Sequence, residues 1–179
     1  MSFHNNAEHI VNDTPLYNSR ILNNYLEYLK KFYPDVDIQP ILDYAGITIY
    51  ELEDPAHWFN QHQSDRFHEI LVTKTGQKDI SREVGRFSAS AKASGAVRQY
   101  TMGFVSPAAA YWVIGKIASN LTRAYHLKTR KLGTNKIEIS AIPRPNTKMM
   151  PYQCDTLLGM LEAVPKLFTN KYAEIEHTE

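Results

Sequence analysis

The spacing of apolar residues changes near residue 123 of this chain, and this change restricts the folds that it can adopt. In the segments before it, apolar residues recur every three or four positions, as on one face of a helix. After it, residues 124–132 and 136–142 alternate between two faces, as in β-strands, around the turn Gly133-Thr134-Asn135. The sequence therefore predicts helices followed by a β-hairpin at 124–142. Because strands and helices do not alternate, the predicted class is α+β.

Capping residues, prolines and glycines place the remaining elements. Five helices are predicted before the hairpin. The first begins at Asn18-Ser19 and stops at Pro34, the second spans 38–44 and is closed by Gly46, and the third begins at Asp54-Pro55 or near Ser64 and ends at Gly76. The fourth spans 80–90 and is capped by Asp79, and the fifth spans 108–122 and is opened by Ser106-Pro107. A helix at 155–168 and a strand at 172–177 follow the hairpin. The expected architecture is an N-terminal helical bundle packed on a small antiparallel sheet.

Composition and length indicate one domain over residues 16–179, preceded by a loose arm at residues 1–15. The sequence stops directly after the predicted strand at 172–177, so we expect a domain truncated at its C-terminus. A single cysteine forms no internal disulfide, no apolar run approaches the roughly 20 residues that span a bilayer, and residues 1–15 lack a signal layout. These features favour a cytoplasmic protein without a membrane partner. The net charge of +1 gives no sign of direct nucleic-acid binding.

The usual catalytic motifs are missing from the sequence. It contains neither a Gly-rich phosphate loop followed by Lys-Ser/Thr nor a G-x-S-x-G elbow. His62, Asp65 and Glu69 share a helix face and have metal-ligand chemistry, although such a trio is typical of a solvent-facing stripe. Cys154 would need a nearby base to act as a nucleophile, but the sequence identifies none beyond the bare option of His126, and a packed cysteine is the simpler interpretation. We therefore predict no catalytic residues and no enzyme activity.

The aromatic side chains suggest a ligand site. An apolar cavity with a few polar groups is the usual form of a small-molecule site, and several of these aromatics have such a group. The alternative is that they simply form the core, and the sequence does not separate the two. The candidate ligand-binding residues are Trp58, Phe67, Phe87, Tyr100, Phe104, Tyr111, Trp112 and Tyr125.

The segment from Tyr152 to His177 resembles the end of the 4-vinyl-reductase-type ligand-sensing domains. The features that carry the resemblance are Cys154, Gly159, Phe168 and the stretch 172–177. These domains occur in bacterial regulators of aromatic catabolism, and they are similar in fold to the small-molecule-binding subunits of transport protein particles.

A longer region, residues 41–144, resembles the N-terminal sensory regions of bacterial histidine kinases, and residues 45–107 share a weaker likeness with effector domains of arabinose-regulator-type transcription factors. The matching segments are Leu42-Asp43-Tyr44-Ala45-Gly46-Ile47, Leu52-Glu53-Asp54-Pro55, His57-Trp58-Phe59, Arg66-Phe67, and Tyr100-Thr101-Met102-Gly103-Phe104 with Ser106-Pro107.

These resemblances imply a sensor domain that binds a small apolar or aromatic ligand between helices and sheet, forms a homodimer and signals to an output domain, as in two-component signal transduction or transcription regulation. Some relatives hold zinc near this end, for which Cys154, Glu174 or Glu176, and His177 are the only matches. A likeness to haem-dependent nitric-oxide sensors is weaker, because residues 17–20 lack the Tyr-x-Ser-x-Arg spacing that haem binding in those sensors requires. We expect no cofactor. The alternatives are a dimerisation or docking module, a reductase-like enzyme and a haem-binding gas sensor.

Overall fold

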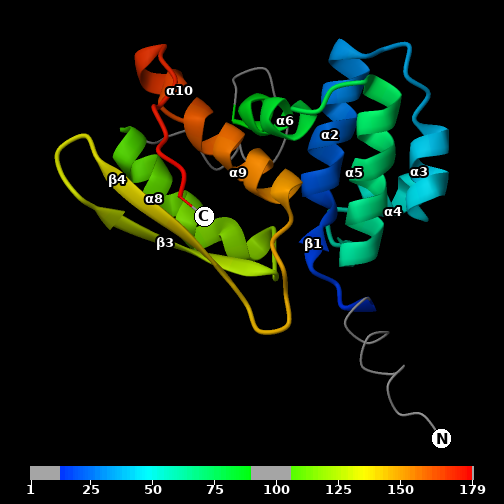
Figure 1. Ribbon diagram of the computed structural model, residues 1–179, viewed down its shortest axis with the longest axis horizontal. Helices are drawn as coiled ribbons and strands as arrows, with labels where there is room; N and C mark the ends of the chain where they lie inside the picture. The colour runs from blue at the N-terminus through cyan, green and yellow to red at the C-terminus, as the bar shows by residue number, and fades with distance from the viewer. Residues whose placement is uncertain (1–12, 90–105, 179) are drawn as a thin grey trace, which may run out of the picture.

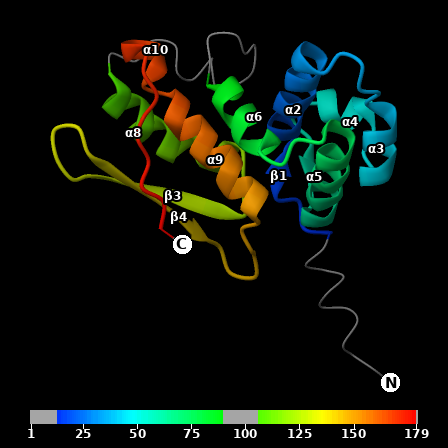
Figure 2. The same cartoon turned by 45° about the horizontal axis from the view of Figure 1, so that its top comes forward.

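A computed structural model describes residues 13–89 and 106–178. The chain forms two packed halves, with the helices α2 to α5 on one side and the hairpin and α8 to α10 on the other (Figures 1 and 2). The first half contains α2 (Ser19–Phe32), α3 (Gln39–Ala45), α4 (Ile49–Glu53), α5 (Gln61–Thr75) and α6 (Ile80–Ser88). The second contains α8 (Pro107–Ile117), the 3-10 turn η1 (Ala118–Asn120), β3 (Tyr125–Lys131), β4 (Ile137–Pro143), α9 (Pro151–Ala163) and α10 (Lys166–Thr169). The predicted α+β class is confirmed.

Capping chemistry fixes most helix ends where the sequence predicts them. The Asn18 side chain accepts a hydrogen bond from the Arg20 N–H at the start of α2. Gly46 and Gly76 close α3 and α5 in the left-handed conformation, with φ of 65° and 68°. Glycine adopts this conformation without the steric cost that a Cβ brings, so these two glycines terminate their helices.

The prediction that Asp54-Pro55 begins a helix is wrong. Residues 54–57 form a turn, and the short strand β2 (Trp58–Phe59) pairs antiparallel with β1 (Tyr17–Asn18). The helix α5 begins only after Asn60, whose side chain forms a reciprocal capping box with Gln63. Pairing with β1 holds residues 58–59 in an extended conformation that the local sequence does not predict.

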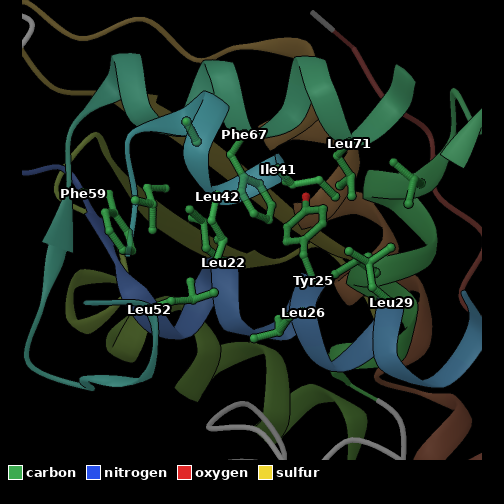
Figure 3. Packing of buried hydrophobic residues seen from close by; sticks show 14 residues of the cluster. Leu22, Tyr25, Leu26, Leu29, Ile41, Leu42, Leu52, Phe59, Phe67 and Leu71 are labelled. Atoms are coloured by element: carbon green, nitrogen blue, oxygen red, sulfur yellow. The ribbon is translucent and has the colours of Figure 1, made fainter. Parts of the chain in front are cut away.

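The first half has its own hydrophobic core between α2, α3, α4 and α5 (Figure 3). Tyr25, Phe59 and Phe67 are its largest fully buried side chains. The rings of Tyr25 and Phe67 meet edge to face with their centroids 5.9 Å apart, a favoured aromatic geometry. The aliphatic members of this core are Leu22, Leu26, Leu29, Ile41, Leu42, Ala45, Ile47, Leu52, Leu71, Ile80 and Val84.

The predicted hairpin is confirmed, with Tyr125 opposite Pro143 at one end and Lys131 opposite Ile137 at the other. The helix α8 packs against β3, and Gly115 of α8 allows this approach because a Cβ there would lie 2.8 Å from Thr129 Oγ1. The predicted helix 155–168 is two helices, because Pro165 interrupts the run between α9 and α10. The predicted helix 108–122 likewise ends at Ile117 and continues as η1.

The predicted strand at 172–177 is wrong, because this segment is irregular in the structure. Its backbone meets a helix and not the edge of a sheet, since the Ala173 N–H donates to the Glu162 carbonyl at 2.9 Å. Ile175 also packs on the core of the second half. One backbone hydrogen bond to α9 and the packing of Ile175 therefore hold this segment against the second half. Among the described residues, no helix is both long and apolar enough to cross a bilayer.

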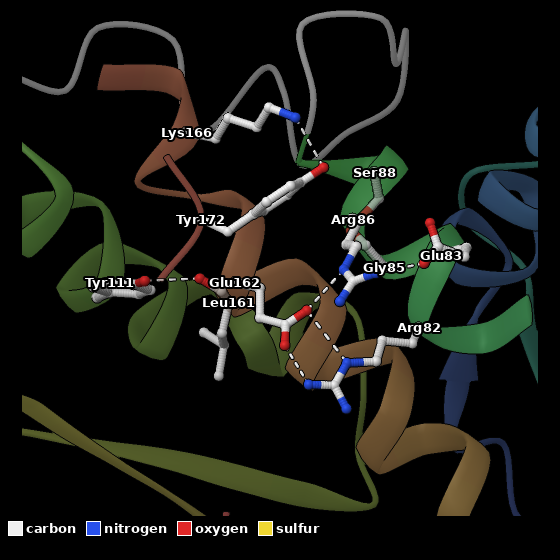
Figure 4. A network of polar contacts seen from close by, with 10 residues as sticks. All are labelled: Arg82, Glu83, Gly85, Arg86, Ser88, Tyr111, Leu161, Glu162, Lys166 and Tyr172. Carbon is white, nitrogen blue, oxygen red and sulfur yellow. Dashed lines mark hydrogen bonds and ion pairs between the residues drawn. The ribbon is translucent and has the colours of Figure 1, made fainter. Parts of the chain in front are cut away.

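The two halves are joined most closely where α6 crosses α9. Gly85 and Gly159 face the opposite helix at this crossing, and a Cβ on Gly85 would lie 2.9 Å from the Met160 nitrogen. Beside the glycines, the buried carboxylate of Glu162 accepts hydrogen bonds from Arg82 and Arg86, with the Arg86 Nε at 2.8 Å (Figure 4). Close packing and this buried ion pair set the separation of the halves.

Candidate functional site

A cavity of about 100 Å³ lies where the two halves meet. Side chains from β1, α2, α5, α6, α8, η1, β3 and α9 form its wall, so no single element contains the site. Its apolar wall consists of Ile21, Leu22, Val84, Ile114, Ile117, Ala118, Leu121, Leu127, Leu157 and Met160. The remaining wall consists of Tyr17, Asn24, Tyr25, Ser64, His68, Ser88, Thr122, Tyr125, Tyr152, Gln153 and Thr156.

The wall of the cavity contains no Asp, Glu, Lys or Arg among the residues that the structure describes. Its polar side chains are hydroxyls, amides and one imidazole. Transfer of a charged group into such surroundings costs far more than transfer of a neutral one, because nothing compensates the lost hydration. The site is therefore chemically suited to an uncharged molecule that is mostly apolar.

A hydrogen-bonded network behind the wall holds two of the tyrosines in place. The Tyr17 hydroxyl donates to Gln61 Oε1 at 2.5 Å, and the Tyr152 hydroxyl donates to Asp65 Oδ1 at 2.8 Å. Gln61 Nε2 also donates to Asp65 Oδ1, at 2.7 Å, which links the two tyrosines. Burial, and then the Asp65 charge, raise the pKa of Tyr152, while burial raises that of Tyr17 to about 12. Both hydroxyls therefore remain protonated donors.

His68 lies on the cavity wall and is neutral. Its ring stacks on Tyr152 at a centroid distance of 3.7 Å and meets the edge of Tyr25 at 4.6 Å. Its Nδ1 is 3.3 Å from Ser81 Oγ, a hydrogen bond whose direction depends on the imidazole tautomer. Complete burial without an acidic partner lowers the pKa of His68 to about 3. The imidazole thus contributes an aromatic face and no charge.

Stability is expected to fall on mild acidification because of His68. The folded protein keeps this imidazole neutral down to pH near 3, whereas the unfolded chain takes up a proton near pH 6.5. The stabilisation is complete above pH 6.5 and declines as the pH falls towards 3, by about 2 kcal/mol between pH 8 and pH 5. Urea unfolding at several pH values measures the slope. His68→Phe should flatten it, whereas the exposed His126→Gln should leave it unchanged.

The hydroxyls on the cavity wall differ in their hydrogen bonding. The Tyr25 hydroxyl and Thr156 Oγ1 are 2.5 Å apart, and this bond joins α2 to α9 across the cavity wall. Ser64 is buried one helical turn before His68 on α5, and its hydroxyl has no hydrogen-bond partner among the described residues. The described wall therefore includes one fully buried side-chain oxygen, Ser64 Oγ, that has no hydrogen-bond partner among the described residues.

One of the eight aromatic residues selected from the sequence, Tyr125, lines the cavity. Tyr111 is in the core of the second half, where its hydroxyl donates to the Leu161 carbonyl at 2.7 Å (Figure 4). Phe67 is in the core of the first half, and Phe87 packs against Phe32 with ring centroids 5.9 Å apart. The selection therefore identified mainly residues that pack elsewhere.

Of the other four selected aromatics, Trp58 and Trp112 lie away from the cavity. Trp58 is in β2, with the Arg123 guanidinium 3.9 Å from its ring centroid. Trp112 is 54% exposed on the outer face of α8, where Lys116 covers its ring. Tyr100 and Phe104 lie outside the described residues.

The metal-binding candidates have other partners or lie on the surface. The Asp65 carboxylate accepts from Gln61 and Tyr152, and the Glu69 carboxylate accepts from the Tyr44 hydroxyl at 3.0 Å. Cys154 is half-buried in α9, Glu176 is exposed 3.4 Å from Lys136, and His177 is exposed. In residues 13–89 and 106–178, no three His, Cys, Asp or Glu side chains are close enough together to hold a metal ion.

Sequence reasoning missed Tyr17, Tyr25, His68 and Tyr152 as wall residues. A signal for His68 was present, since Ser64, His68 and Leu71 fall on one face of α5 and a polar pair on a buried face is unusual. Comparison of the chain with protein-family models, with curated proteins and with solved structures gave no match. The site is therefore interpreted from its geometry and chemistry.

Proposed function

We propose that this domain binds a small, uncharged, predominantly apolar molecule in the cavity between its halves, and that it acts as a ligand-sensing regulatory domain. The observation that carries the proposal is the composition of the wall, which combines aliphatic and tyrosine side chains from both halves without a charged group among the described residues. Ligand pockets of this kind occur preferentially where packed units meet.

The size of the cavity supports a ligand of about one ring. Its volume of about 100 Å³ is of the same order as the roughly 150 Å³ apolar cavity known to hold benzene. The rigid tyrosines, held by Gln61 and Asp65, limit how far the wall can yield. A monocyclic or short-chain apolar molecule fits these limits and falls within the broader class of small apolar or aromatic ligands that the sequence resemblance implies.

Helix α9 offers a physical route from the cavity to the rest of the chain. Thr156 and Met160 of α9 line the cavity, and Glu162 at its end accepts the backbone hydrogen bond of Ala173. Tyr172 is held in turn by Lys166, whose Nζ is 2.9 Å from the tyrosine hydroxyl (Figure 4). A ligand that shifts α9 would therefore also move the segment 170–178, which is the behaviour expected of a regulatory domain.

Filling the cavity tests the proposal. Toluene, as a ligand of suitable size, is expected to raise the melting temperature of the protein, because a molecule that binds only the folded state stabilises it. Ala118→Leu places a larger side chain on the cavity wall and should abolish the shift. Differential scanning fluorimetry over a series of toluene concentrations measures this.

The matched control is Ala108→Leu, which adds the same side chain at an exposed position of α8 and should leave the toluene shift intact. An equal shift in the Ala118→Leu variant would mean that toluene binds somewhere else. Absence of a shift in the unmodified protein for toluene and for other one-ring hydrocarbons would contradict the proposed ligand class.

A further inference from the structure

The Ser64 hydroxyl is the one fully buried side-chain oxygen on the described cavity wall that has no hydrogen-bond partner among the described residues. Ser64 is 2% exposed, and its Oγ has no hydrogen-bond partner among the described residues. The other two buried side-chain atoms without a partner there, Glu27 Oε2 and Thr129 Oγ1, belong to residues that do not line the cavity. Buried polar groups are normally paired, so this exception requires an explanation.

Comparison within the same wall shows that the lack of a partner is not a property of helical hydroxyls. Thr156 Oγ1 donates to the carbonyl four residues earlier at 2.8 Å, and Ser88 Oγ donates to the Gly85 carbonyl at 2.8 Å. Thr75 of α5, the helix that contains Ser64, bonds to the Leu71 carbonyl in the same way. Ser64 lines the cavity and makes no such bond.

We infer that Ser64 is a specificity-determining residue whose hydroxyl pairs with a hydroxyl or carbonyl group of an otherwise apolar, uncharged ligand. The inference rests on the proposed ligand-binding function and adds the polar end of the ligand. A serine hydroxyl both donates and accepts, so it serves either group. The absence of charged residues from the described wall excludes a carboxylate or an ammonium group as this end.

A pair of ligands that differ in one polar group tests the assignment. Benzyl alcohol and ethylbenzene have the same shape, and only the alcohol can pair with Ser64. Their affinities for the full 179-residue chain are measured by ligand-observed NMR titration, and the ratio of the two is compared between variants. Because both compounds meet the same protein in each case, the difference in their hydration cancels from the comparison.

Ser64→Ala is expected to reduce the preference for benzyl alcohol over ethylbenzene by about tenfold, the effect of leaving one buried hydroxyl of the ligand unpaired. Ser88→Ala is the matched control, since it removes a hydroxyl from the same wall that is already paired with Gly85. It should leave the ratio unchanged. Ser64→Ala should fold normally, because it removes a polar group that lacks a partner.

The outcomes separate this inference from the proposed function. If both compounds bind and Ser64→Ala leaves their ratio unaltered, the role of Ser64 is overturned and the ligand-binding function stands. If neither compound binds the unmodified protein, the proposed function fails and the inference fails with it. An equal change of ratio in Ser64→Ala and Ser88→Ala would also overturn the assignment, because the effect would then be general to the wall.

Discussion

Replacing Gly159 with alanine is expected to lower the free energy of unfolding by about 3 kcal/mol, the upper part of the range for overpacking a core. A Cβ at this position would overlap the carbonyl oxygen of Arg82 and lie 3.0 Å from the Arg86 nitrogen. Both atoms are helix backbone, so no side chain can turn aside and α6 must move as a unit. In an exposed helix, the same substitution would stabilise by up to about 1 kcal/mol. Urea unfolding of the purified variant measures the change.

Two controls define the cause of the effect. Gly133 lies in the turn between β3 and β4, where an added Cβ meets nothing within 4 Å. The Gly133→Ala variant should therefore have a stability close to that of the unmodified protein. Gly85→Ala meets the Thr156 carbonyl from the other side of the crossing and should resemble Gly159→Ala. If Gly159→Ala were neutral while the toluene shift was retained, α6 and α9 would not be in the close contact described.

Removing both arginines that bind Glu162 is expected to cost about 4 kcal/mol, the magnitude found when a buried charge loses its partners. The Glu162 side chain is only 8% exposed, so Arg82 and Arg86, and not bulk water, supply most of the hydrogen bonds to its carboxylate. Burial raises the pKa of Glu162, but the hydrogen bonds from the two arginines outweigh it and lower the pKa below the usual value. In the Arg82→Ala/Arg86→Ala variant the carboxylate loses both cationic partners while it stays next to the packed backbones of α6 and α9. Chemical denaturation at pH 7 measures the loss.

The same experiment separates a buried charge from a general loss of contacts. Adding Glu162→Gln to the double variant removes the charge and should restore part of the lost stability. Arg130→Ala breaks an ion pair with Glu138 in which the two side chains are 69% and 42% exposed, and it should cost no more than about 1 kcal/mol. The lowered pKa of Glu162 also means that the stability from this cluster is present above pH about 4.5 and declines as the pH falls further. A double variant as stable as the unmodified protein would contradict the buried pair.

The elements that the sequence predicted well are those whose signals are local. The hairpin at 124–142 follows from alternation on both sides of one turn, and Gly46 and Gly76 mark helix ends through their own backbone preference. The misplaced helix start at Asp54-Pro55 and the strand at 172–177 failed for a common reason. In both places, a partner outside the segment decides the backbone conformation, namely β1 in the first and α9 in the second.

The candidate site was less predictable than the fold. Aromatic content indicated that a cavity was possible, but it did not tell which aromatics face it, and Tyr125 is the one selected residue on the wall among those that the structure describes. Trp112 illustrates the difficulty, because it occupies an apolar helix and yet is 54% exposed. The wall residues come from many different elements. Each element contributes one or a few side chains, and the direction of these side chains depends on how the helices cross.

The sequence by itself determined the order of helices and hairpin, most helix ends, and a composition without the usual catalytic motifs. Only the tertiary structure decided the cavity. The Tyr25 hydroxyl meets Thr156 across 131 positions of sequence, and Gly85 meets the backbone of α9 at a crossing that no local period records. The physical reason is that periodicity shows which face of an element is buried, whereas a cavity is the space that remains after all the buried faces have packed.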